Sequence, residues 1–419
     1  MAFDGVQVDL LFARLSKNVI SPDLNILDEN NLKDVDEATQ RSLNGPRVAD
    51  EILNLVPNKE HFRTTLRCIK MWATRRAIYG NIVGYLGGVA YAILVAKICQ
   101  MYPNAAPSTL LNKFFTVYHQ WSWGRVPILL KPIEEGSLGF KVWNPKTNMR
   151  DRQHLMPIIT PAYPSMNSTY NVSKSTLRVM RNEFERGMHI TSKADSGEGD
   201  WEPLFEETDF FVKYKHYLQI EVNTPNEADH LKWVGFIESK LRFILPKLES
   251  IPNCNLHIFP GYFDNHTTGE NGTFYSSNFF IGMEYKKSNK SDNPVTVDLT
   301  TYVQEFEQML EWPEKKDTMQ PPIFRPIKRN QIPDFVISKE KKRMLLRQQK
   351  ALKRKSEEED KAVKPEETTE TSTEPAAKKT KTDGPETTPE VKKKEPQQVE
   401  VLLGDDDDLL ALYESSNKK

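Results

Sequence analysis

The sequence predicts an α+β fold that ends in a long disordered tail, and three observations predict it. Between residues 46 and 122, apolar side chains recur at the spacing of amphipathic and buried helices. Between residues 206 and 330, the pattern changes to strands and helices in the order β-α-β-β-α. From Ser338 to Leu412 the 419-residue chain has no aromatic residue and is rich in Lys, Glu, Thr and Pro, which is typical of disorder.

The N-terminal end predicts a strand over residues 5–13, with one buried apolar face. The apolar side chains of that face are Val6, Val8, Leu10 and Phe12, and polar residues such as Gln7 and Asp9 alternate with them. Residues 14–45 are polar and predict loop and short helix, with Asn44 in the turn-like segment SLNGPR. Helices are then expected over residues 61–79, 84–101, 110–121 and 171–187, separated by a proline-rich irregular stretch over 123–170.

The next part of the chain predicts a small sheet covered by two helices. In chain order we expect a strand over 209–223, a helix over 227–249, strands over 255–263 and 273–286, a helix over 299–310 and a last strand near Ile323. This order is the split βαβ arrangement. Many RNA-binding domains have it, and so do many proteins that never touch RNA.

Composition excludes several classes of protein. Lys and Arg total 57 and Asp and Glu total 58, so nucleic acid could be bound only by a local basic patch and not by bulk charge. The three cysteines lie far apart in sequence, which excludes a disulfide framework and a Cys-rich zinc site. The most apolar stretch, residues 89–98, is about half as long as a membrane span, so no membrane partner is expected.

The tail, residues 331–419, begins with a segment that predicts a basic helix over 339–355. Its two basic clusters, 341–343 and 353–355, have the spacing of a bipartite import signal and predict a nuclear location. A solvated basic helix would show the same composition. The end, VEVLLGDDDDLLALYES, fits either a docking peptide or an acidic solubilising end.

Several residues outside the predicted core could carry chemistry. Asp9 lies on the polar face of the first strand and could ligate a metal, although an aspartate on an exposed edge strand would look the same. Lys70, at the edge of an apolar helical stripe, could reach a phosphate, with Tyr79 near the end of that helix. The Gly-rich segment 84–89 opens the buried helix, so its N–H groups could face an anion or a base edge, or could serve tight packing alone. Asn44 could equally be a helix cap.

Long segments of the chain resemble the eukaryotic nuclear poly(A) polymerases. They are GVQVDLLFARL, SLNGPRVADEIL, LRCIKMWATRRAIYGNIVGYLGGVAYAILVAKICQMYPNA, MPIITPAYPSMNSTYNVS, FFVKYKHYLQIEV and HLKWVGFIESKLRFIL. The resemblance extends from about Phe3 to about Phe324, and the tail is similar in composition only.

The resemblance implies four parts: a remnant of a nucleotidyltransferase palm over 1–15, a mostly helical central domain over 16–205, an RRM-like ferredoxin-type domain over 206–330 and the tail. It implies template-independent addition of AMP from ATP to an RNA 3′ end, with two divalent ions, Mg²⁺ or Mn²⁺, held by three aspartates. The implied partners are the RNA 3′ end, ATP, and cleavage and polyadenylation factors.

Family positions carry over onto individual residues. Asp9 matches the third catalytic aspartate, which binds a metal. The remaining nucleotide-contacting positions match Asn44, Lys70, Tyr79, Gly88 and Val89. The RNA-contacting segments of the family contain Tyr170, Lys240 and Arg242.

One departure from the family affects the expected activity. The family's Gly-Ser turn and Asp-x-Asp pair precede the strand of Asp9, whereas the sequence begins eight residues before Asp9. Because one carboxylate cannot hold two metals, we expect that this sequence is a truncated part of a full enzyme and has no polymerase activity alone. The alternative is a non-catalytic RNA-binding or regulatory protein. A CCA-adding or cyclic-dinucleotide enzyme is disfavoured by the RRM-like part and the basic tail.

Overall fold

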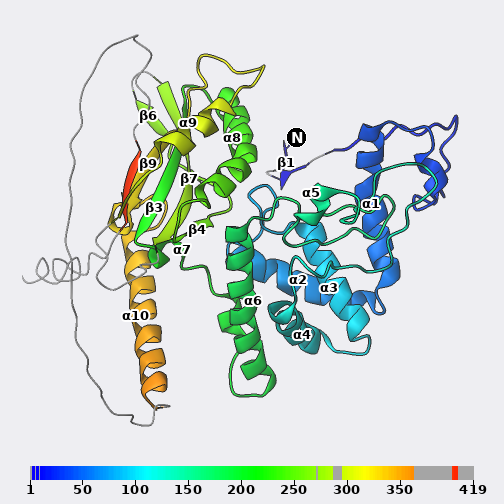
Figure 1. The fold of residues 1–419 in the computed structure, drawn as a ribbon, viewed down its shortest axis with the longest axis horizontal. Helices are drawn as coiled ribbons and strands as arrows, with labels where there is room; N and C mark the ends of the chain where they lie inside the picture. Colours follow the sequence, from blue (N-terminus) through cyan, green and yellow to red (C-terminus); the bar gives the residue numbers. More distant parts are fainter. Residues whose placement is uncertain are drawn as a thin grey trace, which may run out of the picture.

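The computed structural model describes residues 2–4, 6–8, 10–269, 272–285, 295–362 and 399–403. Figure 1 shows two lobes side by side: a helical lobe (residues 29–205) and a sheet lobe (residues 209–362). The predicted α+β fold is confirmed. No helix in the described ranges is long and apolar enough to cross a membrane.

The helical lobe is built around a buried helix. In chain order its helices are α1 (Glu37–Leu55), α2 (Lys59–Arg75), α3 (Gly88–Met101), α4 (Pro107–Gln120), α5 (Met149–Arg152) and α6 (Lys174–Asp195), after a short 3-10 turn η1 (Glu29–Leu32). Helix α3 is buried on nearly all sides, as its apolar sequence predicts. Around it, Trp72 of α2 packs edge-on against Phe115 of α4 and stacks on Phe184 of α6. The four helices expected here are confirmed, although α6 continues to Asp195, eight residues beyond its predicted end.

Helix α1 corrects the expectation of a turn at SLNGPR. The helix starts at the cap Asp36, whose Oδ1 accepts a hydrogen bond from Thr39 N at 2.6 Å, and continues through Pro46. An internal proline costs a backbone hydrogen bond. Tertiary contacts offset this cost, because the Arg47 guanidinium is buried and donates to the carbonyls of Ile26 and Tyr163 at 2.5 and 3.3 Å. Asn44 is therefore inside a helix.

The first residues correct the expectation of a strand with a buried face. Instead, two strands of two residues each, β1 (Ala2–Phe3) and β2 (Val6–Gln7), pair antiparallel, and residues 10–15 have no regular structure. Leu10 and Phe12 are 79% and 83% exposed. An alternating pattern buries a face only where a second layer covers it, and no described residue does so here. Asp9 lies outside the described residues.

The sheet lobe confirms the split βαβ order. Its main strands are β3 (His216–Thr224), β4 (Cys254–Ile258), β7 (Gly272–Tyr285) and β9 (Ile323–Lys328), hydrogen-bonded antiparallel in the order β4-β7-β3-β9. Short strands β5 (Phe263–Asp264) and β6 (Thr267–Gly269) add to β7. Helices α8 (Glu227–Leu248) and α9 (Thr300–Gln308) contact each other, and α8 also contacts strands β3, β4 and β7 (Figure 1).

One element of this lobe differs from its prediction. The expected strand over 209–223 is interrupted: α7 (Phe210–Lys213) is one helical turn, and only then does β3 begin. The turn forms because its aromatic side chains leave the sheet and bury themselves in a separate apolar cluster. That cluster contains Phe210, Phe211, Tyr214, Tyr217, Phe280, Ile332, Ile337 and Leu345.

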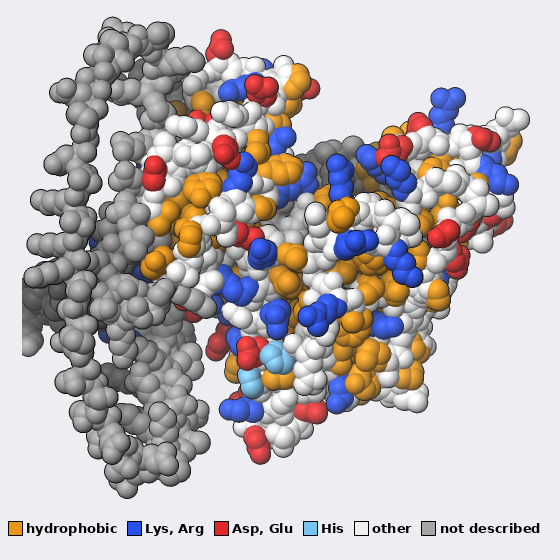
Figure 2. All heavy atoms as spheres, viewed as in Figure 1, with side chains coloured by type: hydrophobic (Ala, Val, Ile, Leu, Met, Phe, Trp, Pro, Cys, Tyr) orange, Lys and Arg blue, Asp and Glu red, His pale blue; other side chains and the backbone are white. Residues whose placement is uncertain are grey.

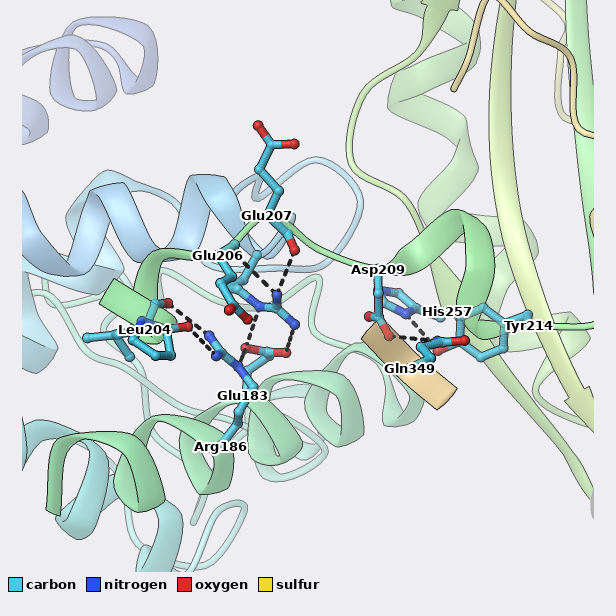
Figure 3. Close-up of polar contacts among 11 residues, drawn as sticks. Glu183, Arg186, Leu204, Glu206, Glu207, Asp209, Tyr214, His257 and Gln349 are labelled. Carbon is cyan, nitrogen blue, oxygen red and sulfur yellow. Dashed lines mark hydrogen bonds and ion pairs between the residues drawn. The ribbon is translucent and has the colours of Figure 1, made fainter. Parts of the chain in front are cut away.

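A buried arginine fixes the segment between the lobes. Arg76 Nε and Nη2 donate to the Glu183 carboxylate at 3.0 and 2.9 Å, and Nη1 donates to the carbonyls of Glu206 and Glu207 at 3.2 and 3.0 Å. Figure 3 shows Glu183 and Arg186 beside this segment, which follows the 3-10 turn η2 (Glu202–Phe205). Burial raises the pKa of Glu183, but the hydrogen bonds and charges of Arg76 and Arg186 outweigh it, so the pKa lies below its usual value. The connection is therefore held and not a loose linker.

The start of the predicted tail is packed. After η3 (Arg329–Gln331), Ile332 and Ile337 are buried, and α10 (Lys339–Ala362) contacts α7. Gln349 donates to Asp209 at 3.0 Å, and Lys341 pairs with Glu207 (Figure 3 shows the Asp209–Gln349 bond). Further on, β10 (Glu400–Leu403) pairs with β8 (Val295–Asp298). The predicted disordered tail thus begins with a helix that its apolar side chains anchor, while residues 363–398 and 404–419 lie outside the described ranges.

Candidate nucleotide and RNA site where the lobes meet

Two predicted nucleotide-binding residues come together at the end of α2. Lys70 is exposed on α2, and its Nζ lies 5.8 Å from the centroid of the Tyr79 ring. Tyr79 stacks on Tyr91 with 5.9 Å between centroids and 9° between planes. Tyr91 is fully buried and donates from its hydroxyl to the Ile78 carbonyl at 2.8 Å. The Tyr79 ring is therefore held from behind, with an ammonium group at its face.

The Tyr79 hydroxyl points at the start of α3. A Cβ built on Gly88, the first residue of α3, would lie 2.9 Å from that oxygen. The cap residue Gly87 has no side chain to cap α3, so within the described residues no side-chain cap covers the first N–H groups at the positive end of the helix. Val89, next in the chain, is 43% exposed. The cluster of Lys70, Tyr79, Gly88 and Val89 can thus receive an anionic group beside an apolar surface.

The Gly-rich turn before α3, residues 80–86, is held by hydrogen bonds within it. Gly80 N donates to Leu86 O and Tyr85 N donates to Gly80 O, both at 3.1 Å. Gly84 has φ +94°, a conformation that favours glycine, and a Cβ there would lie 2.7 Å from the Asn171 carbonyl oxygen. The turn therefore has both a shape and a neighbour that exclude a side chain at Gly84.

The remaining nucleotide candidates lie apart from this cluster. Asn44 is half-buried inside α1, and its Oδ1 is buried with no hydrogen-bond partner in the part of the chain that the structure describes. Among the described residues, no hydrogen bond or ring contact joins Asn44 to Lys70 or Tyr79. Asp9 lies outside the described residues, so the structure does not report its place.

Of the predicted RNA-binding residues, Arg242 connects the two lobes through Asn171, and Tyr170 precedes Asn171 in the chain. Tyr170, just before α6, is 57% exposed. Lys240 on α8 places its Nζ 5.0 Å from the centroid of the Phe236 ring. Arg242 stacks on the exposed Phe243 at 4.8 Å, and its Nη1 donates to Asn171 Oδ1 at 3.2 Å. In Figure 2, basic and hydrophobic side chains are interspersed over the face where the lobes meet.

Asn171 joins the two sets of candidates. Its Nδ2 donates to the carbonyl of Asn81, in the Gly-rich turn, at 3.0 Å, while its Oδ1 accepts from Arg242. Tyr170 is its neighbour in the chain. The exposed aromatic and basic groups near α8 therefore lie next to the turn that leads into α3. Sequence reasoning missed Asn171 and Asn81, because no local pattern links positions that are 90 residues apart.

The junction also contains a buried histidine. The Tyr214 hydroxyl and His257 Nδ1 are 2.7 Å apart, and His257 Nε2 is buried without a partner in the described residues (Figure 3). Burial lowers the pKa of His257 well below its usual range, and the nearby charges of Lys213, Arg178 and Arg76 act in the same direction. The ring is therefore neutral at pH 7 and belongs to the packing between the lobes.

Within the described ranges, no group of three or more His, Cys, Asp or Glu side chains could hold a metal ion. The described side chains therefore do not fit the two-metal site that the resemblance implies, and Asp9 is outside them.

Comparison with known proteins decides the family. Three family models match consecutive parts of the chain: the poly(A) polymerase nucleotidyltransferase domain over residues 1–56, the poly(A) polymerase central domain over 61–207, and the poly(A) polymerase predicted RNA binding domain over 209–272 and 264–345. The chain belongs to the poly(A) polymerase family. The resemblance noted from the motifs is thereby confirmed.

Similar family members come from distant eukaryotes. A poly(A) polymerase of Dictyostelium discoideum is 50% identical over 344 residues, which cover 80% of this chain and 42% of the relative. Nuclear poly(A) polymerases 1 and 4 of Arabidopsis thaliana are 47% and 45% identical over 72% and 80% of this chain, and 42% and 45% of their own lengths. The chain thus spans less than half the length of these relatives.

Proposed function

We propose that this chain binds ATP and an RNA 3′ end as part of a polynucleotide adenylyltransferase that extends RNA with AMP. One observation carries the proposal: Asn171 hydrogen-bonds both Arg242 and the Gly-rich turn, so that the RNA candidates and the nucleotide candidates are neighbours. Transfer of AMP requires this arrangement, because the 3′ oxygen must reach the α-phosphate of ATP.

The nucleotide cluster has a group for each part of ATP. The Lys70 ammonium and the first N–H groups of α3 suit the triphosphate, and the Tyr79 hydroxyl can donate to the same phosphates. The exposed Val89 suits the adenine face, and the approach of Gly88 to the hydroxyl leaves no room for a side chain. Asn44 is proposed near the ribose or adenine on the family resemblance.

The RNA end is proposed to lie along the junction. Tyr170 offers an exposed ring on which a base can stack, and Lys240 supplies positive charge, while Arg242 is included here on the family resemblance alone. Cleavage and polyadenylation factors are the proposed protein partners. The domain limits predicted from the sequence, the role of Asp9 as a metal ligand, Mg²⁺ or Mn²⁺ as the ion, and a nuclear location belong to the same proposal.

Binding measurements on the purified chain test the proposal. Calorimetry with MgATP should show binding that Lys70→Ala weakens by about tenfold, the size expected for one hydrogen bond to a charged group. Lys113→Ala is a matched control, because Lys113 lies over the Tyr102 ring at 5.7 Å on another helix. Lys113→Ala should leave the ATP affinity unchanged.

RNA binding is the second measurement. Oligo(A) should bind with an affinity that falls with salt, and Tyr170→Ala should weaken it. Salt-dependent RNA binding without any ATP binding would favour the non-catalytic RNA-binding alternative. Absence of both would refute the proposal.

A further inference from the structure

The Gly-rich turn over residues 80–86 is held by the sheet lobe as well as by its own helical lobe. The Tyr85 hydroxyl donates to the carbonyl of Ile258, in β4, at 2.8 Å. A Cβ built on Gly80 would lie 3.5 Å from Pro260 Cβ, so the segment after β4 packs directly on the turn. The third connection runs from Arg242 through Asn171 to the carbonyl of Asn81. Gly80 and Tyr85 of the turn therefore contact the sheet lobe directly, and Asn81 is connected to it through Asn171.

Arg242 is oriented for this connection. Its guanidinium stacks on Phe243, its Nη1 donates to Asn171, and its Nε is buried with no hydrogen-bond partner among the described residues. Of its five N–H donors, one is thus bonded to Asn171 and the Nε donor is buried, so only the remaining Nη groups could reach a phosphate. Its support, α8, is a 22-residue helix packed on the sheet, so the group is fixed relative to the whole lobe.

Asn171 transmits this position to the turn. One orientation of its amide satisfies both bonds, with Oδ1 accepting from Arg242 and Nδ2 donating to Asn81 O. Its own carbonyl oxygen rests against Gly84. Gly87, the cap of α3, follows the turn. A Cβ on Gly87 would lie 3.4 Å from Asn81 Cβ, so Asn81 also borders the start of α3.

We propose that Arg242 and Asn171 are positioning residues, by which the sheet lobe sets the shape of the turn that leads into the ATP-binding end of α3. The proposal rests on the proposed function in that it assigns ATP to α3. Its consequence is that Arg242 affects ATP binding more than RNA binding. A direct phosphate contact by Arg242 would have the opposite effect.

Paired variants separate the two roles. Arg242→Lys keeps the charge but loses the planar donor, and Asn171→Asp keeps the acceptor for Arg242 but loses the donor to Asn81. Positioning predicts that both variants weaken ATP binding by about fivefold, the size of one net hydrogen bond, while the oligo(A) affinity and its salt dependence stay unchanged. Lys232→Ala is the control, since Lys232 is an exposed cation on the same helix. It should change neither affinity.

Hydrogen exchange gives a readout that does not need ATP. Amides of the turn, such as Gly84 N and Tyr85 N, should exchange faster in both variants, whereas core amides of α3 should keep the parental rate. The Arg242→Ala/Asn171→Ala double variant should be no worse than the more affected single variant.

Two results would overturn the inference. One is an Arg242→Ala variant in which the slope of log RNA affinity against log salt concentration falls by about 1 while ATP binding stays intact. Such a result would make Arg242 a phosphate contact. The other is unchanged exchange in the turn. If the parental chain bound no ATP, the proposed function would fail, and the exchange measurement would still decide whether the sheet lobe shapes the turn.

Discussion

The contact between Gly88 and Tyr79 allows a quantitative test of the nucleotide site. In Gly88→Ala the new methyl group would lie 2.9 Å from the Tyr79 hydroxyl, whereas an ordinary contact begins at 3.4 Å, so the hydroxyl must move by about 0.5 Å. The ring cannot retreat freely, because it stacks on the buried Tyr91. The added methyl group therefore displaces the hydroxyl from its place at the start of α3.

The size of the effect follows from the bond that is lost. A hydrogen bond to a charged phosphate contributes about 1.5–3 kcal/mol, which corresponds to about 10- to 150-fold in affinity. Tyr79→Phe should lose this contribution by removing the hydroxyl, and Gly88→Ala by displacing it. The Gly88→Ala/Tyr79→Phe double variant should bind ATP no more weakly than Tyr79→Phe, because both changes act on the same oxygen.

Calorimetric titration with MgATP measures the three affinities, and the melting temperature of each variant shows that it is folded. Gly87→Ala is the matched control, because its Cβ meets only Asn81 Cβ, at an ordinary 3.4 Å. Additive losses in the double variant, or an equal loss in Gly87→Ala, would show that the Tyr79 hydroxyl is not the point of contact.

Three further predictions concern stability and location. Gly187→Ala should lower the free energy of unfolding by about 1–3 kcal/mol because the methyl group would overlap the buried Phe115 ring, whereas Gly235→Ala, with open space around it, should raise it by about 0.5–1 kcal/mol; equal urea midpoints would contradict this. Stability should fall as the pH drops below about 6.5, because His257 binds a proton in the unfolded chain but not in the buried folded state, and His257→Gln should flatten that slope in urea titrations at successive pH values. A reporter fused to residues 331–419 should enter the nucleus and lose this location when both basic clusters are replaced by alanine; a cytoplasmic parental fusion would refute the import signal.

Much of the fold could be predicted from local pattern. Helices α2, α3, α4, α6, α8 and α9, and the order of strands and helices along the sheet lobe's chain, follow from periodicity, because a side-chain repeat of 3.6 or 2 residues reports which face is buried. The pattern failed where distant contacts outweighed local preference. Helix α1 continues through Pro46 because Arg47 is anchored by remote carbonyls, and α7 leaves the sheet to bury Phe210.

The candidate site divides in the same way. The motifs identified Lys70, Tyr79, Gly88 and Val89, and the structure brings these four together at one end of α3. The sequence alone determined the family, the order of elements and the residue types suited to phosphate and base. Only the tertiary structure decided that Asn171 lies between Arg242 and Asn81, which are 71 and 90 residues away from it. Hydrogen bonds over such separations depend on how the two lobes pack, and local sequence periodicity carries no record of that packing.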